Sequence, residues 1–401
     1  MEKTSWLSDS KHLIFLSVSG CETNIFLVDC EGKGLTKLTP KVQLSSSYWT
    51  ILYLDPVKDI LIASLDNMRN GTYAKMAILN NLKELIDSNT PMDEINGKAN
   101  WNFININEGV NPMQKSIESL FNEKFHEKVL KYGNSEALFW TLENYDRFSE
   151  KYYEYFPSDQ KLEPPETPSL KPLIVVVHGG PHWNLTGYVE LKMFNLLRGY
   201  NILIPNFTGS CGYGQNHIEN LLGKIGQVDV EEIIGFINQA IDQKLCDPEK
   251  IIIIGGSYGG YLSGIMATHP KYSSIFKAAI LLNPCIDLHF MHVSSDICEW
   301  AASSSLGKKE WWHLEPEEVK LMYEQSPMSR HCKIPCLILL GSKDRRSVYN
   351  ATLAFRNKAL IEGAHVETFV YESGHSLAND PKMEYDVDVK MLSFIAKILK
   401  E

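Results

Sequence analysis

The second half of the chain alternates short apolar runs with segments of helical periodicity. The apolar runs lack the polar alternation of a half-exposed strand, so they are typical of strands buried on both faces. They lie at 173–180, 201–206, 250–256, 277–284, 334–341 and 366–372, and the helical patterns lie at 188–200, 229–245, 258–270 and 386–400. This alternation predicts an α/β domain with a mainly parallel sheet that helices cover on both faces.

The first part of the chain has a different texture. Residues 11–82 hold closely spaced apolar runs separated by turn signals such as Asn70-Gly71. This spacing predicts an all-β segment built as propeller blades or as a sandwich, although no strict internal repeat is visible. A further strand is predicted at 136–142, and the proline-rich stretch at 157–172 is typical of an exposed loop or linker.

Composition and charge exclude several classes of protein. The net charge of −10 argues against a nucleic-acid partner, and no window reaches the roughly 18 apolar residues that a membrane span needs. The N-terminus lacks the features of a signal peptide, so we expect a cytoplasmic chain with reduced thiols. Cys332 and Cys336 have no companion ligands, and the glycine-rich stretch at 206–214 lacks the lysine of a phosphate-binding loop. We therefore expect neither a metal nor a cofactor.

Ser257 lies in the sequence Gly-Gly-Ser-Tyr-Gly, between the apolar run at 250–256 and the helical pattern that follows. A nucleophilic serine needs a very sharp strand-to-helix turn, and only small neighbours let the backbone pass that close. The alternative is a tight turn that merely contains a serine. The strand–turn–helix context favours a nucleophile, with Tyr258 expected to contribute only its backbone N–H.

A serine nucleophile needs a base and an orienting acid, which in this kind of fold follow it in loops after late strands. Asp344 comes just after the run at 334–341, and His375 comes just after the run at 366–372. We predict these two as acid and base. Four other residues fit the order less well: His269, Asp287, His289 and His292.

The sequence His-Gly-Gly-Pro-His at 178–182 follows the first strand of the α/β pattern. A Gly-Gly loop at this place can turn backbone N–H groups toward an oxyanion. We assign the Gly180 and Tyr258 N–H groups to that role. His178 and His182 are expected to brace the loop, and the stretch at 206–214 is expected to border the site.

These motifs together resemble the prolyl oligopeptidase family of serine peptidases. The resemblance rests on H-G-G-P-H (178–182), N-x-x-G-S-x-G-Y-G (206–214), D-P-x-K-I (247–251), G-G-S-Y-G-G (255–260), L-G-x-x-D-R-R (340–346) and the late G-H (374–375). Within the family, the markers are most similar to those of the acylaminoacyl-peptidases. The resemblance implies an α/β-hydrolase domain at 131–401 after a partial β-propeller-like segment at 1–130. It also implies Ser257 as nucleophile, Asp344 as acid, His375 as base and Arg346 as a ligand of a substrate carbonyl.

The chain departs from the family pattern in three places. Family members carry a whole propeller, whereas only about 130 residues precede the hydrolase pattern here. Either the chain is truncated or a fragment, or its propeller is much reduced, which puts size selection of substrates in doubt. Thr208 replaces an arginine in the motif at 206–210, and Cys298 replaces a proline in the motif at 295–300. These two changes concern the substrate pocket more than the predicted triad.

The resemblance implies a serine peptidase that acts on short N-acylated peptides and releases an N-acylamino acid through an acyl-enzyme. Two alternatives stay open. One is a broader esterase or dipeptidyl- or oligopeptidase with the same triad, and the other is a catalytically silent interaction module. Assembly as a homo-oligomer is also open.

Overall fold

The computed structural model describes residues 6–32, 34–40, 47–55, 57–67, 71–105, 125–142, 170–186 and 199–400. Its contacts divide the chain into two compact units, one formed mainly by residues up to 128 and one mainly by residues from 129 on. The predicted linker up to residue 169 and nearly all of the predicted helix at 188–200 lie outside the described residues. The boundary between residues 130 and 131 stays a prediction.

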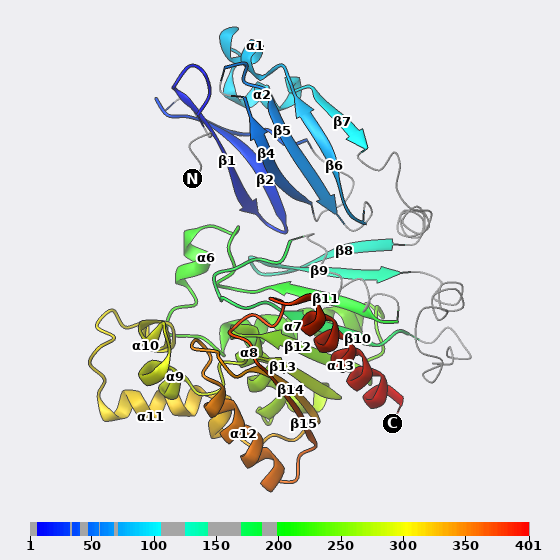
Figure 1. Cartoon of the computed structure of the whole chain (residues 1–401), viewed down its shortest axis with the longest axis vertical. Helices are drawn as coiled ribbons and strands as arrows, with labels where there is room; N and C mark the ends of the chain where they lie inside the picture. Colours follow the sequence, from blue (N-terminus) through cyan, green and yellow to red (C-terminus); the bar gives the residue numbers. More distant parts are fainter. Residues whose placement is uncertain are drawn as a thin grey trace. The chain divides into compact units, whose positions relative to one another are not determined.

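The N-terminal unit is built on a mostly antiparallel sheet of seven described strands (Figure 1). They are β1 (His12–Ser19), β2 (Glu22–Asp29), β3 (Gly34–Lys37), β4 (Tyr48–Leu54), β5 (Leu61–Asn67), β6 (Gly71–Leu79) and β7 (Trp101–Asn105). β1–β3 and β4–β7 each form an antiparallel meander, and the two meanders meet in a parallel contact of Thr23 with Tyr48. Such meanders are the unit from which propeller blades are built.

Two short helices of this unit lie between β6 and β7: α1 (Leu82–Asp87) and α2 (Met92–Lys98). The unit has its own core, in which Trp49, Leu61 and Ile25 are completely buried. The predicted strands of residues 11–82 are therefore present, and the all-β segment is confirmed.

The C-terminal unit contains a sheet in which the described strands follow the order β15-β14-β13-β12-β10-β11-β9-β8. Their bounds are β8 (Phe125–Tyr132), β9 (Ser135–Leu142), β10 (Leu173–Val177), β11 (Asn201–Asn206), β12 (Ile251–Gly256), β13 (Ala278–Leu282), β14 (Cys336–Gly341) and β15 (Val366–Tyr371). β10 to β15 are all parallel, and β9 pairs antiparallel with β11. The predicted, mainly parallel sheet is thus confirmed.

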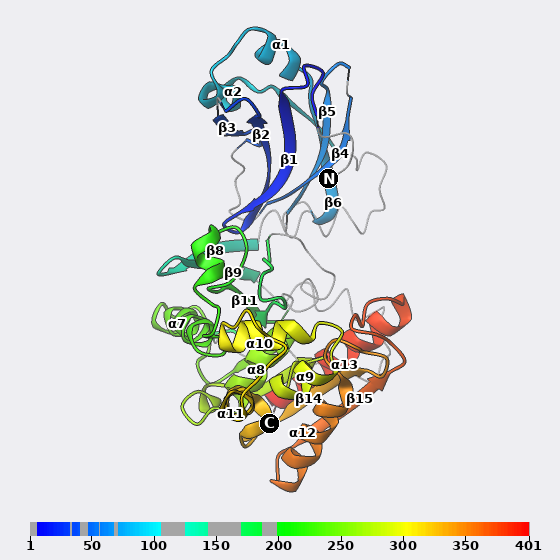
Figure 2. The ribbon, with the colours of Figure 1, turned by 90° about the vertical axis from the view of Figure 1, so that its left-hand side faces the viewer.

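The described helices of this unit follow or connect these strands. Their bounds are α6 (Gln215–Glu219), α7 (Val228–Asp242), α8 (Tyr258–Thr268), α9 (Leu288–Ser294), α10 (Cys298–Leu306), α11 (Pro316–Gln325), α12 (Tyr349–Ile361) and α13 (Pro381–Lys400), with single 3-10 turns at Ser273–Ile275 and Pro327–Ser329. Residues of α7, α8 and α12 share one hydrophobic cluster with one face of the sheet. Figure 2 shows α13 on the opposite side of the sheet from α7.

The central strands explain why the sequence reads as uninterrupted apolar runs. Every residue from Leu173 to Val177 and from Ile251 to Ile254 is buried, because helices cover both faces. A parallel sheet of this kind brings the C-terminal ends of its strands to one edge, where ligand and catalytic sites of open α/β sheets lie. Among the helices that the structure describes, none is both long enough and apolar enough to cross a membrane.

Candidate active site

Ser257 occupies a sharp turn between β12 and α8. Its backbone has φ +55° and ψ −118°, a conformation that a non-glycine residue rarely adopts. A Cβ at Gly255 would lie 2.1 Å from the Gly259 carbonyl oxygen. A Cβ at Gly259 would lie 2.2 Å from the Val177 carbonyl oxygen. The glycines therefore let the turn close, and it presents Ser257 at the edge of the sheet.

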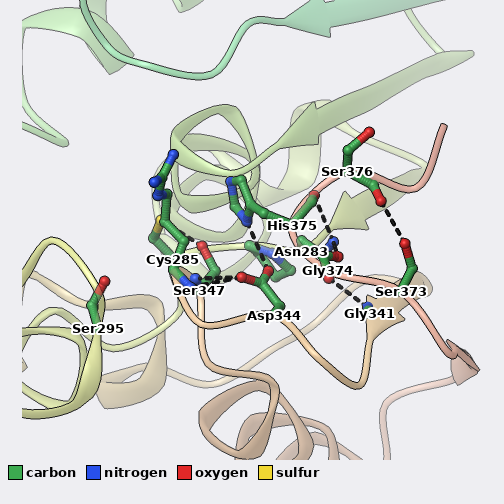
Figure 3. A network of polar contacts seen from close by, with 12 residues as sticks. Asn283, Cys285, Ser295, Gly341, Asp344, Ser347, Ser373, Gly374, His375 and Ser376 are labelled. Carbon is green, nitrogen blue, oxygen red and sulfur yellow. Dashed lines mark hydrogen bonds and ion pairs between the residues drawn. The ribbon is translucent and has the colours of Figure 1, made fainter. Parts of the chain in front are cut away.

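Asp344 and His375 come together across two loops that follow neighbouring strands (Figure 3). His375 Nδ1 lies 2.7 Å from Asp344 Oδ2, and the Asp344 side chain is completely buried. The other carboxylate oxygen of Asp344 accepts backbone hydrogen bonds from Arg346 at 2.8 Å and Ser347 at 3.1 Å. These bonds orient the carboxylate so that Oδ2 can accept a hydrogen bond from the Nδ1–H group of His375. In that tautomer the lone pair that can take a proton from a serine is on Nε2.

Asn283, immediately after β13, connects the two loops. Its Nδ2 donates to the His375 carbonyl at 2.9 Å, and its Oδ1 accepts from Gly341 N at 2.7 Å. The side chain is buried and its backbone lies at φ +40°. Sequence reasoning missed this residue, because an asparagine after a strand usually signals only a turn.

Ser257 and His375 line one cavity of about 350 Å³ in the C-terminal unit. Gly179 and Gly180 form another part of its wall, and a Cβ on Gly179 would lie 3.4 Å from Ser257 Cβ. In the described part of the chain, no group accepts a hydrogen bond from the N–H of Gly180 or of Tyr258. Both N–H groups are thus free to bind an oxyanion.

His178 and His182 both bond to the loop at 206–210. His178 accepts from the Ser210 hydroxyl at 2.8 Å and stacks on Phe207, and His182 Nδ1 lies 2.9 Å from the Gly209 carbonyl. Burial lowers the pKa of His178 to about 4, so its imidazole is neutral. The predicted bracing role of the two histidines is confirmed by these contacts.

Thr208 stands where the family motif has an arginine, and it bonds to α7. Its backbone N–H and its hydroxyl donate to the Glu232 carboxylate at 2.6 and 2.7 Å. The loop that holds His178 and His182 is thereby fixed to the helix. Cys298, the other departure, is the first residue of α10, a position that suits proline and tolerates other residues.

Arg346 lines the cavity and forms an ion pair with Asp296. Its Nε and Nη2 donate to the two carboxylate oxygens at 3.2 and 3.1 Å, and this bidentate bond raises the pKa of Arg346 and lowers that of Asp296. Among the described residues, none accepts from Nη1. Arg345, by contrast, is exposed. Sequence reasoning did not single out Asp296 as the partner.

The Tyr258 side chain is also held by contacts that sequence reasoning did not anticipate, while the assignment of its backbone N–H stays a prediction. The ring is completely buried between Phe207, Tyr261 and Trp300, and its hydroxyl donates to the buried carboxylate of Asp229. A buried hydroxyl requires such a partner. The G-x-S-x-G pattern contains no signal for it, because many residues can occupy the variable positions.

The weaker candidates from the sequence have other contacts. Asp287 caps α9 by accepting from Phe290 N at 2.9 Å, His292 Nδ1 lies 3.2 Å from the Cys298 carbonyl, and His269 stacks on Tyr272. Within the described residues, no three His, Cys, Asp or Glu side chains converge as metal ligands do.

The sheet order, the strand–turn–helix at Ser257 and the loops after β14 and β15 define an α/β-hydrolase. A sequence model of the prolyl oligopeptidase family matches residues 188–401. The chain therefore belongs to the prolyl oligopeptidase family.

Known proteins that resemble the chain agree with this placement. The acylamino-acid-releasing enzyme of Arabidopsis thaliana is 28% identical over 76% of this chain and 39% of its own length, and that of Mus musculus is 24% identical over 98% and 49%. The solved acylaminoacyl peptidase of Pyrococcus horikoshii superposes with a TM-score of 0.72 at 18% identity, over 98% of this chain and 55% of that one. The chain thus spans about half the length of these relatives or less.

Proposed function

We propose that this chain is a serine peptidase that cleaves the first peptide bond of short N-acylated peptides and releases an N-acylamino acid. The observation that carries the proposal is the Asp344–His375 pair on the cavity that Ser257 also lines. Membership of the family and the names of the relatives supply the substrate class. The cavity volume, about 350 Å³, suits a residue-sized group.

The geometry supports acyl transfer through a covalent intermediate. Ser257 attacks the scissile carbonyl while His375 Nε2 takes its proton, and Asp344 stabilises the imidazolium that forms. The Gly180 and Tyr258 N–H groups bind the oxyanion. His375 then protonates the leaving amine, and water, activated by the same imidazole, releases the N-acylamino acid from Ser257.

Two further features support a peptide as substrate. Met291, Ile297 and Trp300 form an apolar part of the cavity wall, which suits an apolar side chain next to the scissile bond. Asp296 binds Nε and Nη2 of Arg346, and no described residue accepts a hydrogen bond from Nη1. We assign Nη1 to a second substrate carbonyl, such as that of the acyl group.

The test combines labelling with two reporter substrates. A fluorophosphonate probe should label the wild-type chain and leave the Ser257→Ala variant unlabelled, and turnover should fall about 10⁴-fold or more. Acetyl-alanyl reporters should be cleaved faster than matched free-amine reporters. Labelling without this preference would favour the broader esterase or dipeptidyl-peptidase alternative, and an unlabelled wild type would favour an interaction module.

A further inference from the structure

The first turn of α7 carries a buried carboxylate that the catalytic steps above do not use. Asp229 is completely buried, accepts from the Tyr258 hydroxyl, and also accepts from the backbone N–H groups of Gly226 at 3.2 Å and Val230 at 2.8 Å. Burial raises the pKa of Asp229 to about 6, so the carboxyl is mostly ionised at neutral pH. A buried ionised group is costly, and it is tolerated when hydrogen bonds satisfy it.

Tyr258 connects this carboxylate to the site. Its backbone N–H is one of the two assigned oxyanion donors, and its hydroxyl is at the other end of a rigid ring. Phe207, Tyr261 and Trp300 pack around that ring at centroid distances of 6.1, 5.5 and 5.8 Å. Because a tyrosine side chain has only two rotatable bonds, fixing the hydroxyl also limits movement of the backbone at the start of α8.

The second donor is linked to the same helix. Glu232 of α7 binds Thr208, and Ser210, two residues further along the same loop, bonds to His178. His178 directly precedes the Gly179–Gly180 loop. Phe207 of this loop also contacts both the His178 ring and the Tyr258 ring. α7 is therefore connected to both N–H donors, and its hydrogen bond with the Tyr258 hydroxyl is made by Asp229.

We propose that Asp229 is a positioning residue for the oxyanion hole, which it serves by holding the Tyr258 hydroxyl and thereby the Tyr258 N–H. The inference rests on the proposed function, since it presumes acyl transfer at Ser257. Oxyanion donors act on the transition state, and loss of one donor typically lowers kcat by about 10²- to 10³-fold. A displaced donor should cost less, about 10- to 100-fold.

The experiment uses the full chain and an activated ester, with active sites counted by fluorophosphonate titration. Tyr258→Phe and Asp229→Leu should each lower kcat per labelled site by about 10- to 100-fold with KM nearly unchanged. The inhibition constant of a peptide aldehyde, whose adduct carries the oxyanion, should rise by a similar factor. Asp229→Asn keeps an acceptor for the hydroxyl and should stay within about threefold of wild type.

Tyr261→Phe is the matched control, because it removes another buried hydroxyl from the same helix. The Tyr261 hydroxyl donates to the Gln325 carbonyl at 3.1 Å and has no bond to Asp229. This variant should lose stability and keep its kcat per labelled site. If Tyr258→Phe and Asp229→Leu lose no more kcat than Tyr261→Phe does, Asp229 has no positioning role.

The double variant and the choice of substrate complete the test. Tyr258→Phe combined with Asp229→Leu should be no slower than the slower single variant, because both changes remove one contact. Additive losses would contradict a shared role. A wild type that hydrolyses the ester and no N-acylated peptide would refute the proposed substrate class, while the ester data still decide about Asp229. A wild type that hydrolyses neither overturns both proposals.

Discussion

At the scale of single residues, the glycines around Ser257 are not equally necessary. The backbone leaves no room for a side chain at Gly255 or Gly259, whereas it leaves room for one at Gly256. A Cβ at Gly255 would lie 2.1 Å from the Gly259 carbonyl oxygen, whereas the nearest atom to a Cβ at Gly256 is 3.7 Å away. Distances near 2 Å demand movement of the backbone, and 3.7 Å is ordinary van der Waals contact. The turn therefore requires glycine at position 255 and has room for a larger residue at position 256, in agreement with the G-x-S-x-G pattern, in which position 256 is variable.

This difference predicts opposite outcomes for two neighbouring substitutions. Gly255→Ala should prevent folding or lower the free energy of unfolding by about 3 kcal/mol or more, because the new methyl group would clash with backbone atoms that cannot easily move. Gly256→Ala should change it by about 1 kcal/mol or less. Urea denaturation measures both, and a stable Gly255→Ala protein would show that the turn is looser than described.

The Arg346 assignment makes a prediction about substrate selectivity. Arg346→Ala should raise KM for N-acylated peptides by about 10- to 100-fold, as expected for loss of a hydrogen bond from a charged donor. Small activated esters without a second carbonyl should be hydrolysed almost normally. Arg345→Ala is the control, since Arg345 is exposed. Equal losses on peptide and ester would indicate that Arg346 supports the Asp344 loop instead.

At the scale of elements, the site depends on how loops after separate strands are fastened together. Lys343 N donates to the Ser373 carbonyl at 2.8 Å, and Ser342 N donates to the Tyr371 carbonyl at 2.8 Å, so the loops after β14 and β15 are directly bonded. Asn283 adds the loop after β13 to this network (Figure 3). The position of His375 therefore depends on hydrogen bonds between the segments that follow β13, β14 and β15.

Asn283→Ala should loosen this network. It leaves the buried Gly341 N–H without its acceptor, at a cost of about 1–3 kcal/mol in the free energy of unfolding, and it frees the His375 backbone. We expect kcat to fall about tenfold or more on every substrate. Asn379→Ala is the control, because Asn379 is exposed in the same region. An unchanged kcat in Asn283→Ala would assign the asparagine to stability alone.

At the scale of the whole molecule, two buried groups bring opposite pH dependences to stability. Burial lowers the pKa of His178 to about 4, below the ordinary value of 6.5. The stabilisation that His178 gives to the folded state is therefore complete above pH 6.5 and is lost as the pH falls toward 4. Burial raises the pKa of Asp229 to about 6, above the ordinary 3.8, so its contribution is present at low pH and is lost as pH rises. Between pH 4 and 6 the two effects oppose each other.

Asp229→Asn should remove the pH dependence of stability that comes from Asp229, because asparagine does not titrate. Relative to wild type, the variant should lose stability on going from pH 6 to pH 4, with a difference in slope of up to about 1.4 kcal/mol per pH unit. His178→Gln should show the opposite difference. Thermal or urea unfolding at several pH values measures both. Parallel curves for wild type and Asp229→Asn would mean that Asp229 has the same pKa folded and unfolded.

Much of the architecture could be predicted from local pattern. Runs such as 173–180 and 250–256 are apolar throughout because both faces of these strands are covered, so periodicity alone indicates a parallel sheet. The order of the strands places Ser257, Asp344 and His375 at strand ends, which is why a site at one edge of the sheet could be expected. Glycine at 255 and 259 is likewise a local requirement of the turn.

Only the tertiary structure decided which residues from distant segments meet. Asp296 pairs with Arg346, Asn283 with His375, and Asp229 with Tyr258, across 50, 92 and 29 positions of sequence. Hydrophobic periodicity reports which side of an element faces the core, and it carries no information about the partner that a buried polar group will find there. That partner depends on how the strands and helices pack, so these contacts became visible only in the folded chain.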